Sequence, residues 1–406
     1  MYRANVTRPW KIVRMEAALN RLRTWVPELP PTGAVIERDA PVVRTHYGTH
    51  GEAGHGPLPD GDLDALVARQ VEAFARRNEP VVWPVYAGDL GLPESLLAAG
   101  FTAEREHAVL VCPIGTDTAK LPGVGHDWPG HQRVADLAAA TGPHRRPYSE
   151  FLADAAHLRQ SAEVVLDGDR AAWLEEIGDV MVVGGVTDPG FAAAIVRHDW
   201  RLAGPHQGVR FLLAEAADDL QAAFEAVGMR ELTSVTRYHW APPGAPARTR
   251  PVRRLFAEPE HDDLWTRFSE EFAFRPDTRA FPGITEPAGS ATWHVGDAED
   301  AALDRFTETI YKGLRESVEP GEELYWLDWH HAGYRFDPAR VDGTGPRWPG
   351  FVFPGGDYHI YLTADLRLGT FGHPWEETIC VFGELLTRVG PELTAALGEP
   401  VRRSEP

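Results

Sequence analysis

Apolar positions recur along the first 245 residues with two spacings, one typical of strands and one of helices. Alternating or continuous apolar runs predict strands at 81–86, 108–112, 209–216 and 232–240. A stripe with helical spacing follows Asp62, and another spans 220–227. Gly100 and Gly228 then stand where helix C-caps are expected. The order strand, helix, glycine, strand occurs twice, which predicts two copies of one small α/β unit.

The remainder of the chain has a different pattern. Helical spacing is found at 262–272 and 301–314, and Pro374 is placed to open a third helix. Strands are predicted at 292–295, 324–329 and 358–362. This mixture is typical of an α+β domain in which an antiparallel sheet carries helices on one face.

Stretches rich in proline and glycine indicate where the chain divides. Residues 115–130 lack apolar periodicity, and residues 241–254 combine prolines with arginines that have no apolar face to support. We therefore predict a first repeat, a second repeat, a Pro/Arg linker and a C-terminal domain at 1–114, 130–240, 241–254 and 255–398. The predicted fold class is α/β (α+β), with mixed sheets in the two repeats and an antiparallel sheet in the C-terminal domain.

Composition limits the kinds of binding partner, cross-link and cellular location that we expect. With 60 acidic against 40 basic residues, the net charge of −20 disfavours nucleic acid and anionic membrane surfaces. The 2 cysteines exclude a disulfide framework and a four-cysteine zinc site. No apolar run has the roughly 18 residues of a membrane span, and the N-terminus lacks a signal-peptide core, so we expect a cytoplasmic protein. Arginine far outnumbers lysine, a skew typical of GC-rich bacterial genomes.

Three segments of the second repeat carry a family resemblance. They are VVGGVTDP at 182–189, RFLLAEA at 210–216 and AFEAVGMRELTSVTRYHW at 223–240. This part of the chain resembles the Gcn5-related N-acetyltransferase superfamily, in a tandem arrangement with a degenerate first repeat. The resemblance implies a cofactor, acetyl-CoA or another acyl-CoA, whose pyrophosphate binds backbone amides at a helix N-terminus. It also implies a small-molecule amine as acyl acceptor.

The resemblance places the cofactor and the chemistry at particular residues. The acyl-CoA would bind at Val186, Thr187, Gly190, Phe191 and Ala192. Two candidates for catalysis lie in predicted strands: Glu215 as general base, and Tyr238.

Two departures from the family pattern keep an alternative open. No Arg-Gly-x-Gly loop follows Pro189, and Phe224 stands where many relatives have a tyrosine that protonates the leaving thiolate. The alternative is a non-catalytic binding, regulatory or immunity-type protein with a protein or small-molecule ligand. It would join a degenerate acyltransferase fold to a recognition module.

The C-terminal domain has a second resemblance. Its segments LDWHHAGYRF at 327–336, PGGDYHIYLTAD at 354–365 and LGTFGHPWE at 368–376 resemble the bacterial domain of unknown function 2716. The resemblance implies a shared fold and no activity, because none is assigned to that family.

Polar and aromatic residues of these segments predict a cleft. Its candidate residues are Trp329, His330, Asp357, His359 and His373. Tryptophan and tyrosine beside acids and histidines suit a cationic or sugar-like ligand, and the alternative is a tryptophan-rich core. The spacing matches no named metal signature, so no metal ligands are predicted. A metal-dependent hydrolase in this domain remains a third hypothesis.

Overall fold

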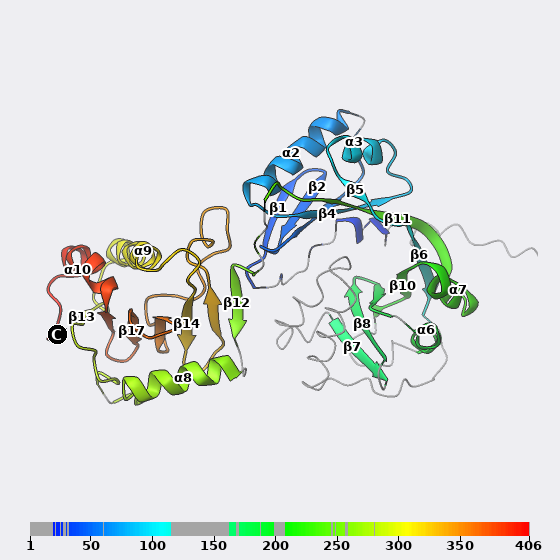
Figure 1. Ribbon diagram of the computed structural model, residues 1–406. Helices are drawn as coiled ribbons and strands as arrows, with labels where there is room; N and C mark the ends of the chain where they lie inside the picture. The colour runs from blue at the N-terminus through cyan, green and yellow to red at the C-terminus, as the bar shows by residue number, and fades with distance from the viewer. Residues whose placement is uncertain are drawn as a thin grey trace, which may run out of the picture. The chain divides into compact units, whose positions relative to one another are not determined.

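The computed structural model divides the chain into two compact units, residues 1–249 and 250–406 (Figure 1). The residues that it describes are 19–20, 22–24, 26, 30, 32–59, 61–114, 162–167, 170–186, 188–198, 208–244, 247, 249–255, 259–279 and 281–405. The predicted connector at 115–130 lies outside these residues.

The first unit repeats one order of elements twice. The first copy consists of β1 (Val35–Asp39), β2 (Val42–His46), β3 (Gly51–His55), α2 (Leu63–Arg76), β4 (Val81–Tyr86), α3 (Leu92–Ala98), β5 (Thr102–Ala103) and β6 (His107–Pro113). The second consists of β7 (Ala162–Asp167), β8 (Arg170–Ile177), β9 (Val180–Gly184), α6 (Pro189–Arg197), β10 (Phe211–Ala216), α7 (Asp218–Ala226) and β11 (Arg230–Trp240). In each copy, three antiparallel strands lead through a helix to a parallel strand. A second helix and a last strand follow.

The two copies build one mixed sheet by exchanging their last strands. The strand order is β1-β2-β3-β4-β11-β6-β10-β9-β8-β7, with β5 paired to β11. Equivalent strands of the two copies lie at equivalent distances from the two ends of this sheet. β11 pairs with β4 of the first copy, whereas β6 pairs with β10 of the second. Neither copy therefore has a complete sheet of its own.

Equivalent glycines end the second helix of each copy. The N–H of Gly100 donates to the Leu97 carbonyl at 3.0 Å, and that of Gly228 to the Glu225 carbonyl at 3.0 Å. The φ angles are +89° and +102°, a region that glycine enters without strain. The same backbone conformation at both positions confirms the internal repeat that the sequence predicts.

The second unit is an antiparallel sheet with helices, which confirms the predicted fold class. Its elements are β12 (Val252–Leu255), α8 (Pro259–Glu271), β13 (Ala291–His294), α9 (Asp300–Glu316), β14 (Leu324–Asp328), β15 (Gly333–Phe336), β16 (His359–Thr363), β17 (Gly369–His373), β18 (Thr378–Phe382), α10 (Glu384–Leu397) and β19 (Arg402–Arg403). The strand order is β12-β15-β14-β16-β17-β18-β13-β19. Part of the segment predicted as a linker, from Val252 onward, thus forms a strand of this sheet.

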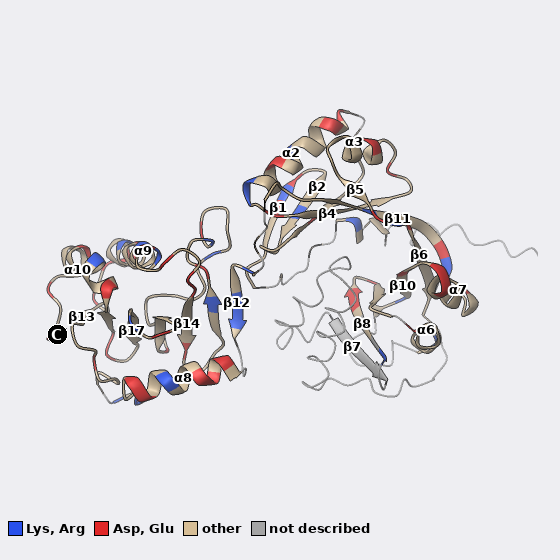
Figure 2. Ribbon diagram, in the orientation of Figure 1, with Lys and Arg blue, Asp and Glu red and all other residues tan. Residues whose placement is uncertain are grey.

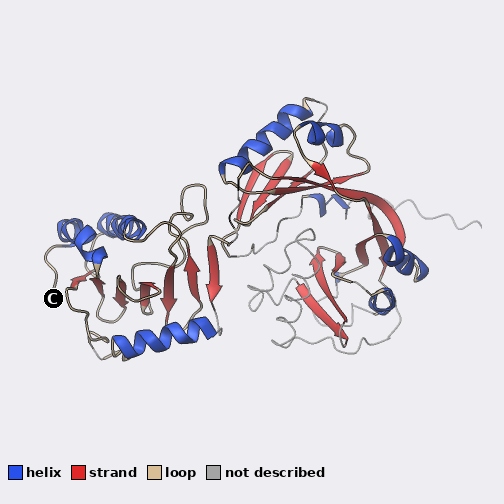
Figure 3. Ribbon diagram, viewed as in Figure 1, coloured by secondary structure: helices blue, strands red, loops and turns tan. Residues whose placement is uncertain are grey.

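Two expectations for the second unit are wrong. Helices cover both faces of the sheet, because α9 and α10 pack in one core cluster and α8 packs in another (Figure 3). Pro374 opens no helix: the chain turns there between β17 and β18, and α10 begins only at Glu384. β-branched Thr378, Ile379 and Val381 favour a strand, and the apolar spacing after Pro374 belongs to the buried strand β18 followed by α10.

Acidic and basic side chains are interspersed over both units (Figure 2). Helix α8, for example, carries Glu260, Asp262, Glu270 and Glu271 with Arg267 among them. Among the described residues, no helix combines the length and the apolar character that crossing a membrane requires.

Candidate functional site

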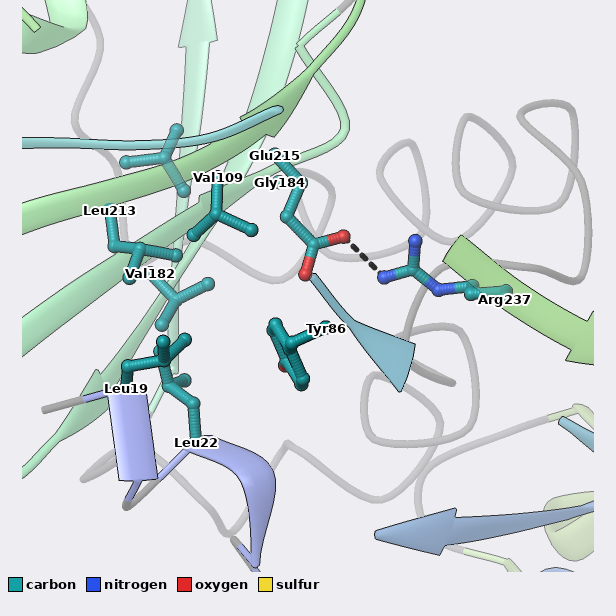
Figure 4. A pocket seen from close by; sticks show the side chains of 10 residues that line it. Leu19, Leu22, Tyr86, Val109, Val182, Gly184, Leu213, Glu215 and Arg237 are labelled. Atoms are coloured by element: carbon teal, nitrogen blue, oxygen red, sulfur yellow. Dashed lines mark hydrogen bonds and ion pairs between the residues drawn. The ribbon is translucent and has the colours of Figure 1, made fainter. Parts of the chain in front are cut away.

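The parallel strands β9 and β10 separate partway along their length. They are paired from Val180 and Phe211 as far as Val183 and Ala214. Beyond that point Glu215 continues in β10 paired only with Val109 of β6. A cavity of about 50 Å³ lies at the separation, lined by Leu19, Leu22, Tyr86, Val109, Val182, Val183, Gly184, Leu213, Glu215 and Arg237 (Figure 4).

Glu215 lines this cavity and forms an ion pair. Its carboxylate accepts a hydrogen bond from the Arg237 guanidinium, and the two side chains point toward one another (Figure 4). Although burial opposes the charge of Arg237, the charge and hydrogen bond of Glu215 raise the pKa of Arg237 above its ordinary value. Glu215 would have to weaken this pair to act as a base.

Tyr238 lies on the other side of the sheet. Successive residues of a strand point to opposite faces, so Arg237 faces the cavity and Tyr238 faces away from it. The Tyr238 side chain is buried in the core cluster that contains Leu66 of α2 and Leu96 of α3. Glu215 and Tyr238 are therefore not brought together.

The first turn of α6 bears the residues predicted for cofactor binding. Asp188 is its N-cap, and the Asp188 carboxylate accepts the Phe191 N–H at 2.7 Å. The Ala192 N–H donates to the Asp188 carbonyl at 3.1 Å. Backbone amides of the predicted loop are thus already hydrogen-bonded within the helix start.

Most side chains around this turn pack in the hydrophobic core. Val186, Phe191 and Ala192 are buried in the cluster beneath α6 and α7. Gly190 is exposed in the first turn, and Thr187 lies outside the described residues. Asp188 was not among the predicted site residues, although aspartate directly before proline is a known N-cap signature.

In the second unit, two buried carboxylates each contact a histidine. Asp328 and Asp357 are both 6% exposed. Asp328 Oδ1 lies 2.8 Å from His331 Nδ1, and Asp357 Oδ2 lies 2.7 Å from His330 Nδ1. The hydrogen bond and charge of Asp328 raise the pKa of His331. Two His–Asp pairs therefore meet at the end of β14.

His359 lies beside the same carboxylate from the neighbouring strand. It is the register partner of Asp328, and its Nε2 is 3.7 Å from Asp328 Oδ2. Its Nδ1 lies 2.6 Å from the Phe353 carbonyl oxygen. Burial lowers the pKa of His359 despite that carbonyl and the nearby carboxylates, which favours the neutral ring.

His373 and Trp329 belong to an aromatic cluster instead. The His373 ring is 5.0 Å from that of Tyr358, and the Trp329 ring is 5.7 Å from that of Tyr358. Tyr358 packs in the core cluster with α8. The Trp329 ring also contacts the His330 ring in a tilted arrangement, with centroids 3.9 Å apart, so it joins this cluster to the His–Asp pairs.

The structure thus brings His330, Asp357 and His359 around Asp328, and it places His373 in the aromatic cluster. Asp328 and His331 were not in the predicted cleft. The signal for them is the run Asp-Trp-His-His directly after a buried strand, because strand ends bring such side chains to one sheet edge.

Several of the solved structures that resemble this chain are acetyltransferases. The chain is similar to a GCN5-related N-acetyltransferase from Kribbella flavida, with 16% identity and a TM-score of 0.40 over 56% of this chain and 95% of that one. A GCN5-related N-acetyltransferase from Sphaerobacter thermophilus has 14% identity and a TM-score of 0.37 over 55% of this chain and 85% of that one.

Sequence comparison finds relatives of unassigned function. The chain is 28% identical to the uncharacterized protein YxiI of Bacillus subtilis (strain 168) over 145 residues, which are 33% of this chain and 88% of that protein. Residues 255–387 match the model of the family described as "Protein of unknown function (DUF2716)", as the motifs of the C-terminal domain predict.

Proposed function

We propose that the first unit is a non-catalytic binding unit with an acetyltransferase-like fold. The observation that supports this proposal is the Asp188 cap of α6. In an acyl-CoA enzyme, amides at this helix start would hold a pyrophosphate. Here a carboxylate takes the Phe191 amide at 2.7 Å.

The charge of Asp188 opposes a cofactor phosphate directly. A carboxylate at the N-terminus of a helix already satisfies the positive end of the helix dipole. A phosphate at the same place would face a like charge at about 4 Å, which costs about 1–4 kcal/mol depending on exposure. Asp188 therefore stabilises the start of α6 and, although Arg170 lies 3.4 Å from its carboxylate, places an acidic group where the cofactor phosphate would bind.

The remaining groups support the same proposal. The cavity of about 50 Å³ is far smaller than the roughly 300–1,000 Å³ of typical cofactor sites. Glu215 is engaged by Arg237, and Phe224, in the place of the family's proton donor, is a buried core residue. A small ligand is expected there, and an amine would have to compete with Arg237 for the Glu215 carboxylate.

Acyl transfer is the second candidate, and the separation of β9 from β10 favours it. Strands that part in this way leave room for the thioester arm of an acyl-CoA between them, and Glu215 lies at that place. Both candidates therefore use the same cavity but differ in whether CoA binds.

Isothermal calorimetry of the full chain with acetyl-CoA, and with CoA alone, distinguishes the candidates. We expect no heat and no shift of the unfolding temperature at millimolar ligand. A parallel assay of thiol release with a panel of primary amines should stay at the background rate. Micromolar binding of acetyl-CoA together with amine-dependent thiol release would establish the transferase instead.

A further inference from the structure

The second unit contains a cluster of histidine and aspartate side chains that the proposed function does not use. Asp328, His331 and Asp357 each offer one ligand atom, and these atoms lie within 4.8 Å of one another. We propose that these three residues, with His359, bind a divalent transition-metal ion of the Zn²⁺ class. This site belongs to the second unit alone and does not depend on whether the first unit binds acyl-CoA.

His359 is the second observation that supports a metal site, because it adds a buried imidazole to the carboxylates. Its side chain is buried, and its Nδ1 lies 2.6 Å from the Phe353 carbonyl oxygen. Because a carbonyl oxygen only accepts hydrogen bonds, Nδ1 holds a proton, which leaves Nε2 as the ring atom that can bind a metal ion.

That ring atom faces a carboxylate. Nε2 lies 3.7 Å from Asp328 Oδ2, beyond hydrogen-bonding distance, and none of the described residues donates to it. Two electron-rich atoms facing each other repel unless a proton, a water molecule or a metal ion lies between them. A metal ion bound to both removes this repulsion.

The distance between His359 and Asp328 is close to that between two ligands of one ion. With metal–ligand bonds of about 2.0–2.1 Å, neighbouring donors of a tetrahedral ion lie about 3.3 Å apart. The observed 3.7 Å differs from that value by a shift that a side chain makes by rotating slightly. The hydrogen bond from Nδ1 to Phe353 is also the usual support of a metal-bound histidine, which donates its other N–H to a carbonyl or carboxylate.

The two carboxylates supply the charge that a cation needs. Asp328 and Asp357 are both 6% exposed, and burial of two anions side by side is costly without a cation. Their partners His331 and His330 are exposed, with 72% and 60% of their side-chain surface accessible. The cluster is therefore buried on its carboxylate side and open to solvent on its histidine side, where an ion can enter.

Two glycines allow the backbone conformation around the cluster. Gly356 has φ +90°, which lets the chain turn immediately before Asp357. A Cβ atom on Gly372 would lie 2.9 Å from Pro354, so glycine there lets the 353–356 loop pack against β17. This loop brings the Phe353 carbonyl to His359 and Asp357 to His330.

The mixed donors indicate the class of ion. Imidazole nitrogens with carboxylate oxygens suit Zn²⁺ and neighbouring transition metals, whereas Ca²⁺ and Mg²⁺ prefer oxygen ligands throughout. We therefore expect Zn²⁺ to bind more tightly than Mg²⁺.

Zn²⁺ titration of the chelator-stripped full chain, followed by calorimetry and thermal unfolding, tests the site. We expect one ion per chain and a rise in the unfolding temperature of about 4 °C or more at saturating Zn²⁺. His331→Ala and Asp357→Asn should each weaken binding at least about 10-fold. His331 is exposed, so its variant should retain the wild-type circular dichroism even if Asp357→Asn unfolds.

A matched control is available in the same unit. His294 also lies near two carboxylates, 3.8 Å from Asp297 and 3.9 Å from Glu377, but outside the cluster. His294→Ala should bind Zn²⁺ as the wild type does. The proposal is overturned if the wild type takes up no Zn²⁺, if folded His331→Ala binds it unchanged, or if equimolar Mg²⁺ displaces it.

Discussion

At the scale of single residues, Asp188 and Asp62 have the same structural role in different surroundings. Each caps a helix by accepting an N–H three residues ahead, at 2.7 Å for Phe191 and 2.9 Å for Ala65. Asp62 starts a helix that no ligand is expected to approach. Asp188 starts the one helix at which the acyltransferase resemblance implies a phosphate. The same capping bond therefore has a functional consequence at only one of the two positions.

Replacing each cap distinguishes its effect on the free energy of unfolding from its effect on CoA affinity. Asp188→Ala and Asp62→Ala should each lower the free energy of unfolding by about 1 kcal/mol, because each removes one capping bond. Only Asp188→Ala should raise the affinity for CoA, by about 10-fold, since it removes the like charge and releases the Phe191 amide. Urea unfolding and calorimetry measure the two effects. Equal CoA affinity in the two variants would contradict the role given to Asp188.

Glu37 makes the stability of the first unit depend on pH. Burial opposes its charge, but the hydrogen bonds and charges of Arg77, His46 and Arg44 lower its pKa from 4.5 to about 2. Since the pKa is lower in the folded state, this stabilisation is complete above pH 4.5 and is lost as the pH falls toward 2.

Urea unfolding at pH 5 and pH 3 tests the contribution of Glu37. Between these values the wild type should lose about 1–2 kcal/mol more stability than Glu37→Gln, allowing for partial solvent screening. The glutamine variant has no charge to lose at this position. An identical pH dependence of the two proteins would show that Glu37 is not a stabilising anion.

At the scale of elements, the two copies of the first unit show how the sequence repeat becomes structure. Each ends its second helix at a glycine with positive φ, and a strand follows that pairs with the other copy. The apolar run after Gly228 would form a strand whether it paired within its own copy or with the other copy. Sequence periodicity therefore predicts the strand but not its partner. Pairing of β11 with β4 is decided by the packing of both copies together.

Alanine at either glycine tests the equivalence of the two copies. Gly100→Ala and Gly228→Ala should each cost about 1–2 kcal/mol, because a Cβ atom is strained at positive φ. No atom lies within 4 Å of a Cβ placed on Gly228, so the expected cost arises from the backbone alone. Gly88→Ala, which also has open space and no positive φ, should change stability by less than about 0.5 kcal/mol. A neutral Gly228→Ala would refute this account.

At the scale of the whole molecule, each unit has its own hydrophobic core. Among the described residues, the core clusters of the second unit contain residues from 252 to 397 only. Those of the first unit contain residues from 19 to 240 only. The two His–Asp pairs and the cavity beside Glu215 therefore belong to separately packed parts of the chain.

The second unit should accordingly fold alone. A protein of residues 250–406 is expected to unfold cooperatively in urea and to give a dispersed amide NMR spectrum, because its sheet and helices are complete. A protein of residues 1–114 is the comparison, since its β6 would lack its neighbour β10. We expect that shorter protein to aggregate or remain unfolded. A molten 250–406 protein would contradict the division into units.

Local sequence determined the glycine-terminated helices, the Asp62 cap and most strands, because periodicity and capping act within a few residues. Both family resemblances also rest on contiguous motifs. Tertiary structure alone decided the exchange of β6 and β11 and the separation of His373 from His359. It also placed Asp328 beside His359, since strands β14 and β16 are joined only in the sheet. Register between distant strands depends on packing and backbone hydrogen bonding across the whole sheet, which a single sequence does not display.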